Sequence, residues 1–181
     1  MTLPMRESKK IPYYEHSQGV TGQIRNSGGH RKTGTLLHVL RSLRNHVCQI
    51  LAYDCPINSW RVKLHRWRGV NIGKNVFLGQ HCTLDNTYPE YIYLEDGCGL
   101  SGEAYILAHQ NPGVLAKSLL EAYVAPVVIQ KNVFVGIRCT ILPGVTIGEK
   151  AIVSAGSIIS KDVPPHSVVA PAKNRIIKNI E

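Results

Sequence analysis

Aliphatic residues return at every sixth position through most of the chain after Val70. A period of six matches neither the 3.6-residue period of an α-helix nor the two-residue alternation of a β-strand. It is typical of a short strand followed by a turn, repeated so that the units coil and stack, because no single unit buries its apolar face alone. The twelve aliphatic positions are Ile72, Leu78, Leu84, Leu94, Leu100, Ile106, Ile129, Val135, Ile141, Ile147, Val153 and Ile159.

A second position of the repeat, four residues after the aliphatic one, holds a small or β-branched residue. Its members are Val76, Cys82, Cys98, Ala104, Val133, Cys139, Val145, Ala151, Ser157 and Val163. We therefore predict that the three cysteines in this series are small core residues, not metal ligands or nucleophiles. The chain has five cysteines and no C-x-x-C pair, which argues against a zinc site or a disulfide framework and agrees with a reducing compartment.

Residues 35–53 have the period of an amphipathic helix. Apolar residues recur at spacings of three and four, and the opposite side carries polar residues that we expect to face water. The apolar positions are Leu36, Leu40, Leu43, Val47 and Leu51, and the polar positions are Arg41, Arg44 and Asn45.

A second, shorter helix is predicted after Pro56, with Ser59 as its N-cap and Gly69 at its end. Two interpretations of both helices stay open: their apolar stripes pack onto the rest of the protein, or they form a basic membrane-surface element. In this helix the stripe is Trp60, Leu64 and Trp67, and the basic residues expected to be exposed are Arg61, Lys63, Arg66 and Arg68.

The positive charge is concentrated ahead of the repeat. Residues 1–70 hold 12 Lys and Arg against 3 Asp and Glu, whereas residues 71–181 hold 9 of each. Such a block can meet nucleic acid, an anionic lipid surface or an acidic glycan, or can be a solvated face without a partner. No aromatic-interleaved RNA motif accompanies it, so we expect no nucleic-acid partner.

The chain divides into three predicted parts: a flexible basic arm over residues 1–34, a helical segment over 35–69 and the repeat over 70–181. The repeat is interrupted by a loop excursion over residues 110–126 and closes in a C-terminal tail. No apolar run is long enough to span a membrane, and Met1 to Lys10 lack the apolar region of a signal peptide. A cytoplasmic protein is therefore expected, with possible contact to the inner face of the membrane through the basic third.

Residues 70–75 (VNIGKN) and 145–150 (VTIGEK) resemble the repeats of the bacterial hexapeptide-repeat acyltransferase family. Its members include galactoside, maltose, serine and xenobiotic acetyltransferases and polysaccharide O-acetyltransferases. The resemblance covers about residues 70–178. It implies an all-β fold, a left-handed parallel β-helix preceded here by the short helical segment. It also implies a homotrimer with active sites between subunits, and acetyl-CoA as the donor with no metal.

His109 lies where the excursion opens, and it matches the family segment in which a strand ends on the catalytic histidine. An imidazole with a pKa near 6.5 can take the proton of a hydroxyl that attacks a thioester and return one to the leaving thiolate. Asp85 lies at the other break of the repeat, where several relatives place a carboxylate that faces the acceptor or orients the histidine. A plain turn residue is the equal alternative for Asp85. Glu103 is a weaker candidate for the residue that orients the histidine.

The closing segment, residues 153–165 (VSAGSIISKDVPP), resembles the part of the family that contacts coenzyme A. The resemblance assigns the pantetheine arm to backbone at Gly136 and Ala155, and the nucleotide end to the residues that follow. A flexible ammonium or a guanidinium fork suits phosphate oxygens, although each could equally be an ordinary exposed charge. The residues carried over for the nucleotide end are Ser160, Lys161, Lys173 and Arg175.

The function predicted from these residues is an acetyl-CoA-dependent O-acetyltransferase acting on a sugar or surface-polysaccharide hydroxyl, with His109 as general base. N-acetylation of an amino sugar is a close variant. A zinc carbonic anhydrase on the same fold would need three histidines, and His81 together with His109 does not supply them. A non-enzymatic β-helical scaffold or binding module is the remaining alternative.

Overall fold

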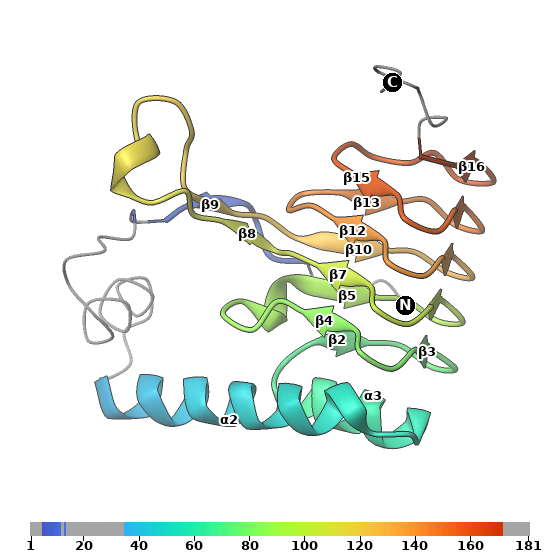
Figure 1. Cartoon of the computed structure of the whole chain (residues 1–181), viewed down its shortest axis with the longest axis horizontal. Helices are drawn as coiled ribbons and strands as arrows, with labels where there is room; N and C mark the ends of the chain where they lie inside the picture. Colours follow the sequence, from blue (N-terminus) through green and yellow to red (C-terminus); the bar gives the residue numbers. More distant parts are fainter. Residues whose placement is uncertain (1–4, 12, 14–34, 172–181) are drawn as a thin grey trace, which may run out of the picture.

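The structure is a computed structural model that describes residues 5–11, 13 and 35–171 of the 181-residue chain. From Asn71 onward the chain forms a three-sided solenoid, in which short strands alternate with turns and stack into three parallel sheets (Figure 1). Two helices, α2 (Thr35–Asp54) and α3 (Asn58–Trp67), precede the solenoid and cover its first coil. The coiled repeat of strands predicted from the six-residue period is confirmed, and so are two helices ahead of it.

Each coil contributes one strand to each sheet in turn, so the sheets have the orders β13-β10-β5-β2, β16-β14-β11-β6-β3 and β15-β12-β7-β4. The first two coils contain β2 (Asn71–Ile72), β3 (Phe77–Leu78), β4 (Thr83–Leu84), β5 (Ile92–Leu94), β6 (Gly99–Leu100) and β7 (Tyr105–Ile106). The later coils contain β10 (Val127–Ile129), β11 (Phe134–Val135), β12 (Thr140–Ile141), β13 (Thr146–Ile147), β14 (Ile152–Val153), β15 (Ile158–Ile159) and β16 (Val168–Val169).

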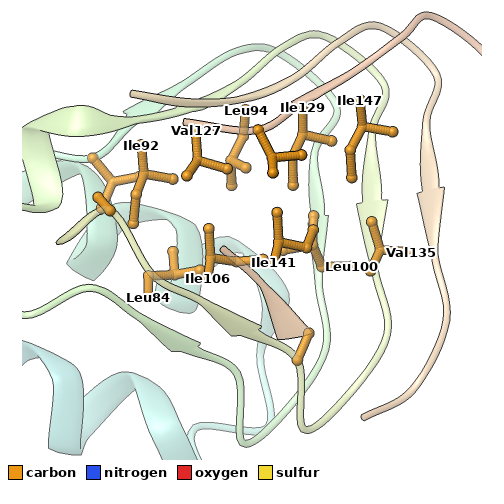
Figure 2. Packing of buried hydrophobic residues seen from close by; sticks show 14 of the residues in the cluster. Leu84, Ile92, Leu94, Leu100, Ile106, Val127, Ile129, Val135, Ile141 and Ile147 are labelled. Carbon is orange, nitrogen blue, oxygen red and sulfur yellow. The ribbon is translucent and has the colours of Figure 1, made fainter. Parts of the chain in front are cut away.

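The core of the solenoid is a column of aliphatic side chains that point inward from all three sheets (Figure 2). The register places each repeat residue on its equivalent one coil away, as in the series Ile72, Leu94, Ile129 and Ile147. Eleven of the twelve aliphatic positions are buried, and Ile72, in the first coil, packs against the cluster from its edge. The small positions are buried as well, including Cys82, Cys98 and Cys139, which are core residues as predicted.

Gly79 follows β3 and packs against the backbone of the next coil. A Cβ atom at this position would lie 2.3 Å from the nitrogen of Gly102 and 2.6 Å from the carbonyl carbon of Ser101. We expect Gly79→Ala to lower the free energy of unfolding by roughly 1–3 kcal/mol, because the two coils must move apart. Gly99→Ala is the matched control, since its nearest atoms would lie at 3.8 and 4.0 Å. Equal shifts of the two melting temperatures would contradict this packing.

The apolar stripe of α2 faces away from the solenoid, which contradicts the first of the two interpretations, that the stripe packs onto the rest of the protein. Leu43 on this stripe is 58% exposed, whereas Cys48 and Ala52 on the opposite side are 1% exposed and the predicted wet-side residue Asn45 is 3% exposed. The helix exists as predicted, but its inward face is the one that carries the polar residues. The exposed apolar side chains of α2 are Leu36, Leu37, Val39, Leu40, Leu43, Val47, Ile50 and Leu51.

The inward face of α3 is also the basic one. Arg61 and Arg68 were expected in solvent and are 4% and 0% exposed, whereas Trp60 and Trp67 are 60% and 65% exposed. The predicted N-cap is wrong too: Ile57 occupies the N-cap position and no side chain caps it. The helix ends ahead of Gly69, whose φ of 109° suits glycine, as expected.

Both helices turn their polar side inward because they cover the end of the solenoid. The first coil has no preceding coil to pair with, so its backbone carbonyl groups need donors from elsewhere. Polar side chains of the helices supply them: Arg61 Nε donates to Leu78 O at 2.6 Å and Arg66 Nε donates to Ile72 O at 3.2 Å. The other pairs are Asn45 with Asn86, Gln49 with Cys82, Asn58 with Val76, and Arg68 with Leu84 and Asp85.

His65, 1% exposed in this layer, makes the fold sensitive to acid. Its Nδ1 accepts a hydrogen bond from Arg68 Nε at 3.0 Å. Burial and the neighbouring positive charges of Arg68 and Arg61 lower the pKa of His65 from 6.5 to about 3. Between these pH values His65 is protonated in the unfolded chain and neutral in the folded chain. The free energy of unfolding therefore decreases as pH falls from about 6.5 toward 3.

We expect this linkage to remove up to about 4 kcal/mol of stability between neutral pH and the folded pKa. His65→Asn keeps an acceptor near the Nδ1 position and cannot take up a proton. Urea denaturation at pH 7 and pH 4 should show a smaller loss for this variant than for the wild type. The same loss in both proteins would show that another group carries the acid sensitivity.

The excursion leaves the solenoid after β7 and returns at β10. It forms a two-stranded antiparallel hairpin of β8 (His109–Gln110) and β9 (Tyr123–Val124), with a short 3-10 helix at Val114–Ala116 between them. Strand β1 (Lys9–Lys10) pairs with β9 on its other side. Residues 9–10 therefore depart from the expected flexible arm, whereas residues 14–34 lie outside the described part of the chain. No described helix is long and apolar enough to cross a membrane.

Candidate active site

The structure brings Asp85 and His109 together at the two breaks of the repeat. Asp85 follows β4 and His109 comes shortly after β7, and these neighbouring strands pair Leu84 with Ile106. Asp85 Oδ2 lies 2.5 Å from His109 Nδ1. The carboxylate side chain is 0% exposed and the imidazole side chain is 29% exposed. The pair therefore has a buried orienting group and a ring that reaches solvent.

Backbone amides complete the coordination of the Asp85 carboxylate. Oδ1 accepts hydrogen bonds from the nitrogens of Thr87 and Tyr88, and Oδ2 accepts one from the nitrogen of Ala108, all at 2.9 Å. Burial alone would raise the pKa of Asp85, but the hydrogen bonds from His109 and these amides outweigh it and hold the pKa below its ordinary 3.8. The carboxylate is thus charged and accepts from every group around it.

This arrangement fixes the tautomer of His109. An ionised carboxylate can only accept, so Nδ1 of the imidazole carries a hydrogen, and in the neutral ring Nε2 is the nitrogen with the free lone pair. The ring of Tyr88 meets the imidazole edge-on, with centroids 5.2 Å apart, and limits how the ring can turn. A neutral histidine held with Nε2 unprotonated and partly exposed is suited to removing a proton from a substrate.

Sequence reasoning missed the residues that support this pair from behind. The Arg68 guanidinium donates to Leu84 O at 2.5 Å, to Asp85 O at 3.1 Å and to Asn86 Oδ1 at 3.0 Å. Burial lowers the pKa of Arg68 to about 10, so the side chain stays charged at neutral pH. It clamps the backbone on both sides of the Asp85 Cα atom.

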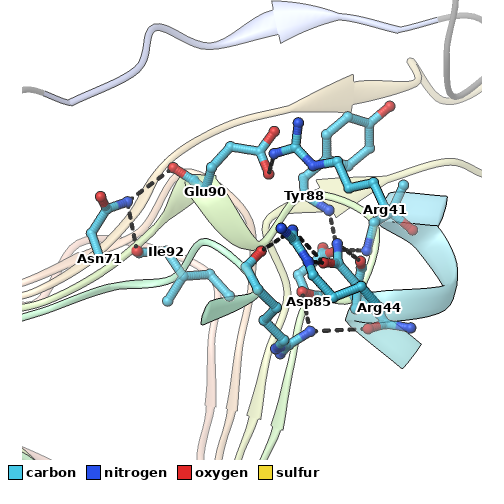
Figure 3. Close-up of polar contacts among 11 residues, drawn as sticks. Arg41, Arg44, Asn71, Asp85, Tyr88, Glu90 and Ile92 are labelled. Carbon is cyan, nitrogen blue, oxygen red and sulfur yellow. Dashed lines mark hydrogen bonds and ion pairs between the residues drawn. The ribbon is translucent and has the colours of Figure 1, made fainter. Parts of the chain in front are cut away.

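Helix α2 adds further contacts to the same stretch of chain (Figure 3). Arg41 Nη2 lies 3.5 Å from Oε2 of the buried Glu90, just beyond the Asp85 turn. Arg44 Nη2 donates to the carbonyl oxygen of Arg68 at 3.3 Å. The helical layer therefore both closes the solenoid and holds the turn that carries the carboxylate. The sequence signal available for this role was the polar side of α2, which amphipathicity alone assigns to solvent.

Glu103, the weaker candidate for orienting His109, has a different partner. It lies at a corner of the second coil with a φ of 59°, and its Oε2 accepts a hydrogen bond from Arg138 Nε at 2.6 Å. Arg138 occupies the equivalent corner one coil later, with a φ of 57°. The structure therefore uses Glu103 as a link between stacked corners.

The residues assigned to the donor lie in the later coils. Gly136 packs against the next coil so closely that a Cβ atom would lie 2.6 Å from the nitrogen of Ala155. Ser160 and Lys161 follow β15 and are exposed. Lys173 and Arg175 lie outside the described residues. A cavity of about 290 Å³ adjoins β15, lined by Gly156, Ser157, Ile158, Ile159, Val169, Ala170 and Pro171.

Ser160 and Lys161 follow β15, which lies in the same sheet as β7, whereas Gly136 and Ala155 follow β11 and β14 of another sheet. His109 comes just after β7, and β12 separates β7 from β15. Two steps of about 4.8 Å place β15 roughly 10 Å further along the solenoid axis. An extended substrate lying along the axis would span this separation.

Among the described residues no group of three His, Cys, Asp or Glu side chains could hold a metal ion. His81 pairs with Asp54 at 3.2 Å and stacks near the ring of Tyr53, on the helical side of the first coil. The two histidines considered for zinc thus have separate carboxylate partners.

Part of the solenoid matches a known family model. Residues 126–161 match the family described as the hexapeptide repeat of succinyl-transferase. The galactoside O-acetyltransferase of Escherichia coli K12 is 32% identical over 115 residues, which cover 61% of this chain and 54% of that protein. The chain thus spans about half the length of this curated relative.

Solved structures agree on the fold. The hexapeptide-repeat acetyltransferase of Vibrio cholerae, solved with acetyl coenzyme A, superposes with a TM-score of 0.62 at 18% identity, covering 85% of this chain and 92% of that one. A maltose O-acetyltransferase from Clostridium difficile 630 gives a TM-score of 0.55 at 24% identity, covering 78% of this chain and 89% of that one. At these identities the likeness is one of fold.

Proposed function

We propose that this chain, which carries the hexapeptide repeats of the transferase family matching residues 126–161, is an acetyl-CoA-dependent O-acetyltransferase. Its acceptor is a hydroxyl of a sugar or of a surface polysaccharide. The observation that carries the proposal is the Asp85–His109 pair, with Nδ1 bound to a buried carboxylate and Nε2 left as a base. The relationship to a galactoside O-acetyltransferase supports the choice of donor and acceptor class.

His109 acts twice in the proposed reaction. Nε2 takes the proton of the acceptor hydroxyl while its oxygen forms a bond to the thioester carbonyl carbon. The carbon–sulfur bond then breaks, and the departing thiolate receives the proton from Nε2, leaving an acetyl ester and the free thiol of coenzyme A. Asp85 stabilises the imidazolium between these steps and keeps the ring in one tautomer.

The donor lies along the later coils in this proposal. Backbone at Gly136 and Ala155 contacts the pantetheine arm in this proposal, at a point where the missing side chain of Gly136 lets the two coils pack closely. Ser160, Lys161, Lys173 and Arg175 meet the nucleotide end. The stacked coils are left-handed and three copies of the chain form a homotrimer, so that the cleft at His109 is completed by a neighbouring subunit.

The test is donor binding followed by transfer. Acetyl-CoA should raise the melting temperature of the protein, and free thiol should then appear only when an acceptor is present in a panel of sugars, amino sugars and glycan fragments. A hydroxyl acceptor supports O-transfer, and activity with amino sugars alone would instead establish N-acetylation. Absence of any stabilisation by acetyl-CoA or coenzyme A would overturn the donor assignment and favour a β-helical scaffold.

A further inference from the structure

We infer that the outward face of α2 and α3 docks onto an anionic lipid surface. We call this the outer helical face. It consists of the exposed apolar residues of α2 together with Trp60, Lys63 and Trp67 of α3, and Leu40, Leu43 and Val47 lie along its centre. The inference does not depend on acetyl transfer.

The outer helical face has no cover in the described part of the molecule. Figure 1 shows α2 and α3 closing one end of the solenoid, with no described element beyond them. Their inward sides are occupied by hydrogen bonds to the first coil, as with Arg61 and Leu78 O. If the helices turned their apolar side inward, the carbonyl groups of the first coil would lose these hydrogen bonds. The apolar stripe therefore stays on the outward side.

Residues 14–34, which lie outside the description, do not suit this face as an occupant. Val20 and Ile24 are the only aliphatic residues in that stretch, which is otherwise polar and rich in glycine. Two aliphatic side chains cannot cover a stripe that runs the length of a 20-residue helix.

The positive charge of the helical layer favours an anionic partner. Of the six Lys and Arg side chains of residues 35–69, Lys63 and Arg66 are exposed, whereas Arg41, Arg44, Arg61 and Arg68 contact groups on the inward side. The one acidic residue, Asp54, pairs with His81 toward the first coil, so the exposed charge of this layer is positive. A second copy of this layer would bring like charges together, whereas an anionic bilayer offers apolar interior and opposite charge at once. The arrangement of Leu, Val and Ile flanked by Trp and Lys is that of helices that lie in a bilayer interface.

Both tryptophans of the chain, Trp60 and Trp67, lie on the outer helical face. Tryptophan prefers the interface between headgroups and acyl chains because its ring is apolar and its N–H donates a hydrogen bond. The intrinsic fluorescence of the protein therefore reports on this surface alone.

The experiment uses the full chain with vesicles of phosphatidylcholine alone or mixed with phosphatidylglycerol. We expect co-sedimentation with the mixed vesicles, weakening as salt is raised, and a blue shift of tryptophan emission that brominated lipid quenches. Leu43→Glu should weaken binding at least tenfold. Leu119→Glu is the matched control, because Leu119 is 83% exposed and lies on the excursion instead of the helices.

Two results would overturn the inference. Equal binding by the Leu43→Glu and Leu119→Glu variants would mean that charge alone holds the protein on vesicles. Tryptophan emission that is already blue-shifted without lipid, together with a loss of oligomer in Leu43→Glu by analytical ultracentrifugation, would mean that a second copy covers the face. Melting temperatures of both variants near that of the wild type establish that each is folded.

Discussion

His109→Ala should lower acceptor-dependent release of coenzyme A thiol by roughly 10²–10⁴-fold, the contribution of a positioned general base. The imidazole contacts the buried Asp85 and Tyr88, but its side chain is 29% exposed at the edge of the hairpin, so we expect the variant to stay folded. Acetyl-CoA should still raise the melting temperature of the variant, because the donor residues lie in the later coils. Initial rates at saturating donor measure the loss.

The control for this variant is His81→Ala. His81 also pairs with a carboxylate, Asp54, at 3.2 Å, but its side chain is 42% exposed on the helical side of the first coil. We expect its rate to match the wild type. If the two alanine variants lost activity to the same degree, the assignment of His109 as the base would fail.

Asp85→Asn should reduce the rate further than its small change in shape suggests, by up to about 10⁴-fold, the loss seen when a triad carboxylate becomes an amide. All four groups around the carboxylate donate hydrogen bonds to it: the nitrogens of Thr87, Tyr88 and Ala108, and Nδ1 of His109. An asparagine has one oxygen and one NH₂ group in place of the two carboxylate oxygens. Its NH₂ group, itself a donor, must therefore face two of these four hydrogen-bond donors.

Either orientation of the amide is costly. With NH₂ toward His109, the ring must present Nδ1 as an acceptor and lose its lone pair at Nε2. With NH₂ toward Thr87 and Tyr88, two buried amides lose their acceptor, at about 1–3 kcal/mol each. Loss of rate with little change in KM for the donor, together with a lower melting temperature, is the expected pattern. Wild-type activity in the folded variant would show that Asp85 is only a turn residue.

The interior of the solenoid could be predicted from the sequence because its packing repeats. Every coil places an aliphatic residue on its equivalent in the next, so a single period identifies the core, and the small positions follow from the same geometry. Cys98 illustrates this: burial raises the pKa of its thiol to about 12, as befits a core residue. Signals that repeat over many coils are insensitive to any one exception.

The orientation of the helices could not be predicted in this way. Amphipathicity assigns the apolar side of a helix to the protein because most protein interiors are apolar. Here the surface to be covered is a row of backbone carbonyl groups, so Arg61 and Arg68 are buried and Leu43 is exposed. Nothing local in residues 35–69 distinguishes the two cases, since the deciding partners, such as Leu78 O, lie in the solenoid.

The candidate site was predictable to the extent that the family segment and the breaks of the repeat mark it. His109 is predicted as the base and Asp85 as a residue that orients it, faces the acceptor or only forms a turn, and the structure places the two in contact. Arg68 was assigned to solvent, although it donates to the carbonyl oxygens of Leu84 and Asp85, on both sides of the Asp85 Cα atom. Its role depends on the folding of α3 against the first coil, which local sequence does not encode.

The most direct test of the central claim is identification of the product by mass spectrometry, after incubation of the wild type and of His109→Ala with acetyl-CoA and the best acceptor from the panel. We expect an acceptor carrying one added acetyl group on a hydroxyl in the wild-type reaction, and only a trace in the variant. An unmodified acceptor with the wild-type protein, or equal amounts of acetylated product with both proteins, would contradict it.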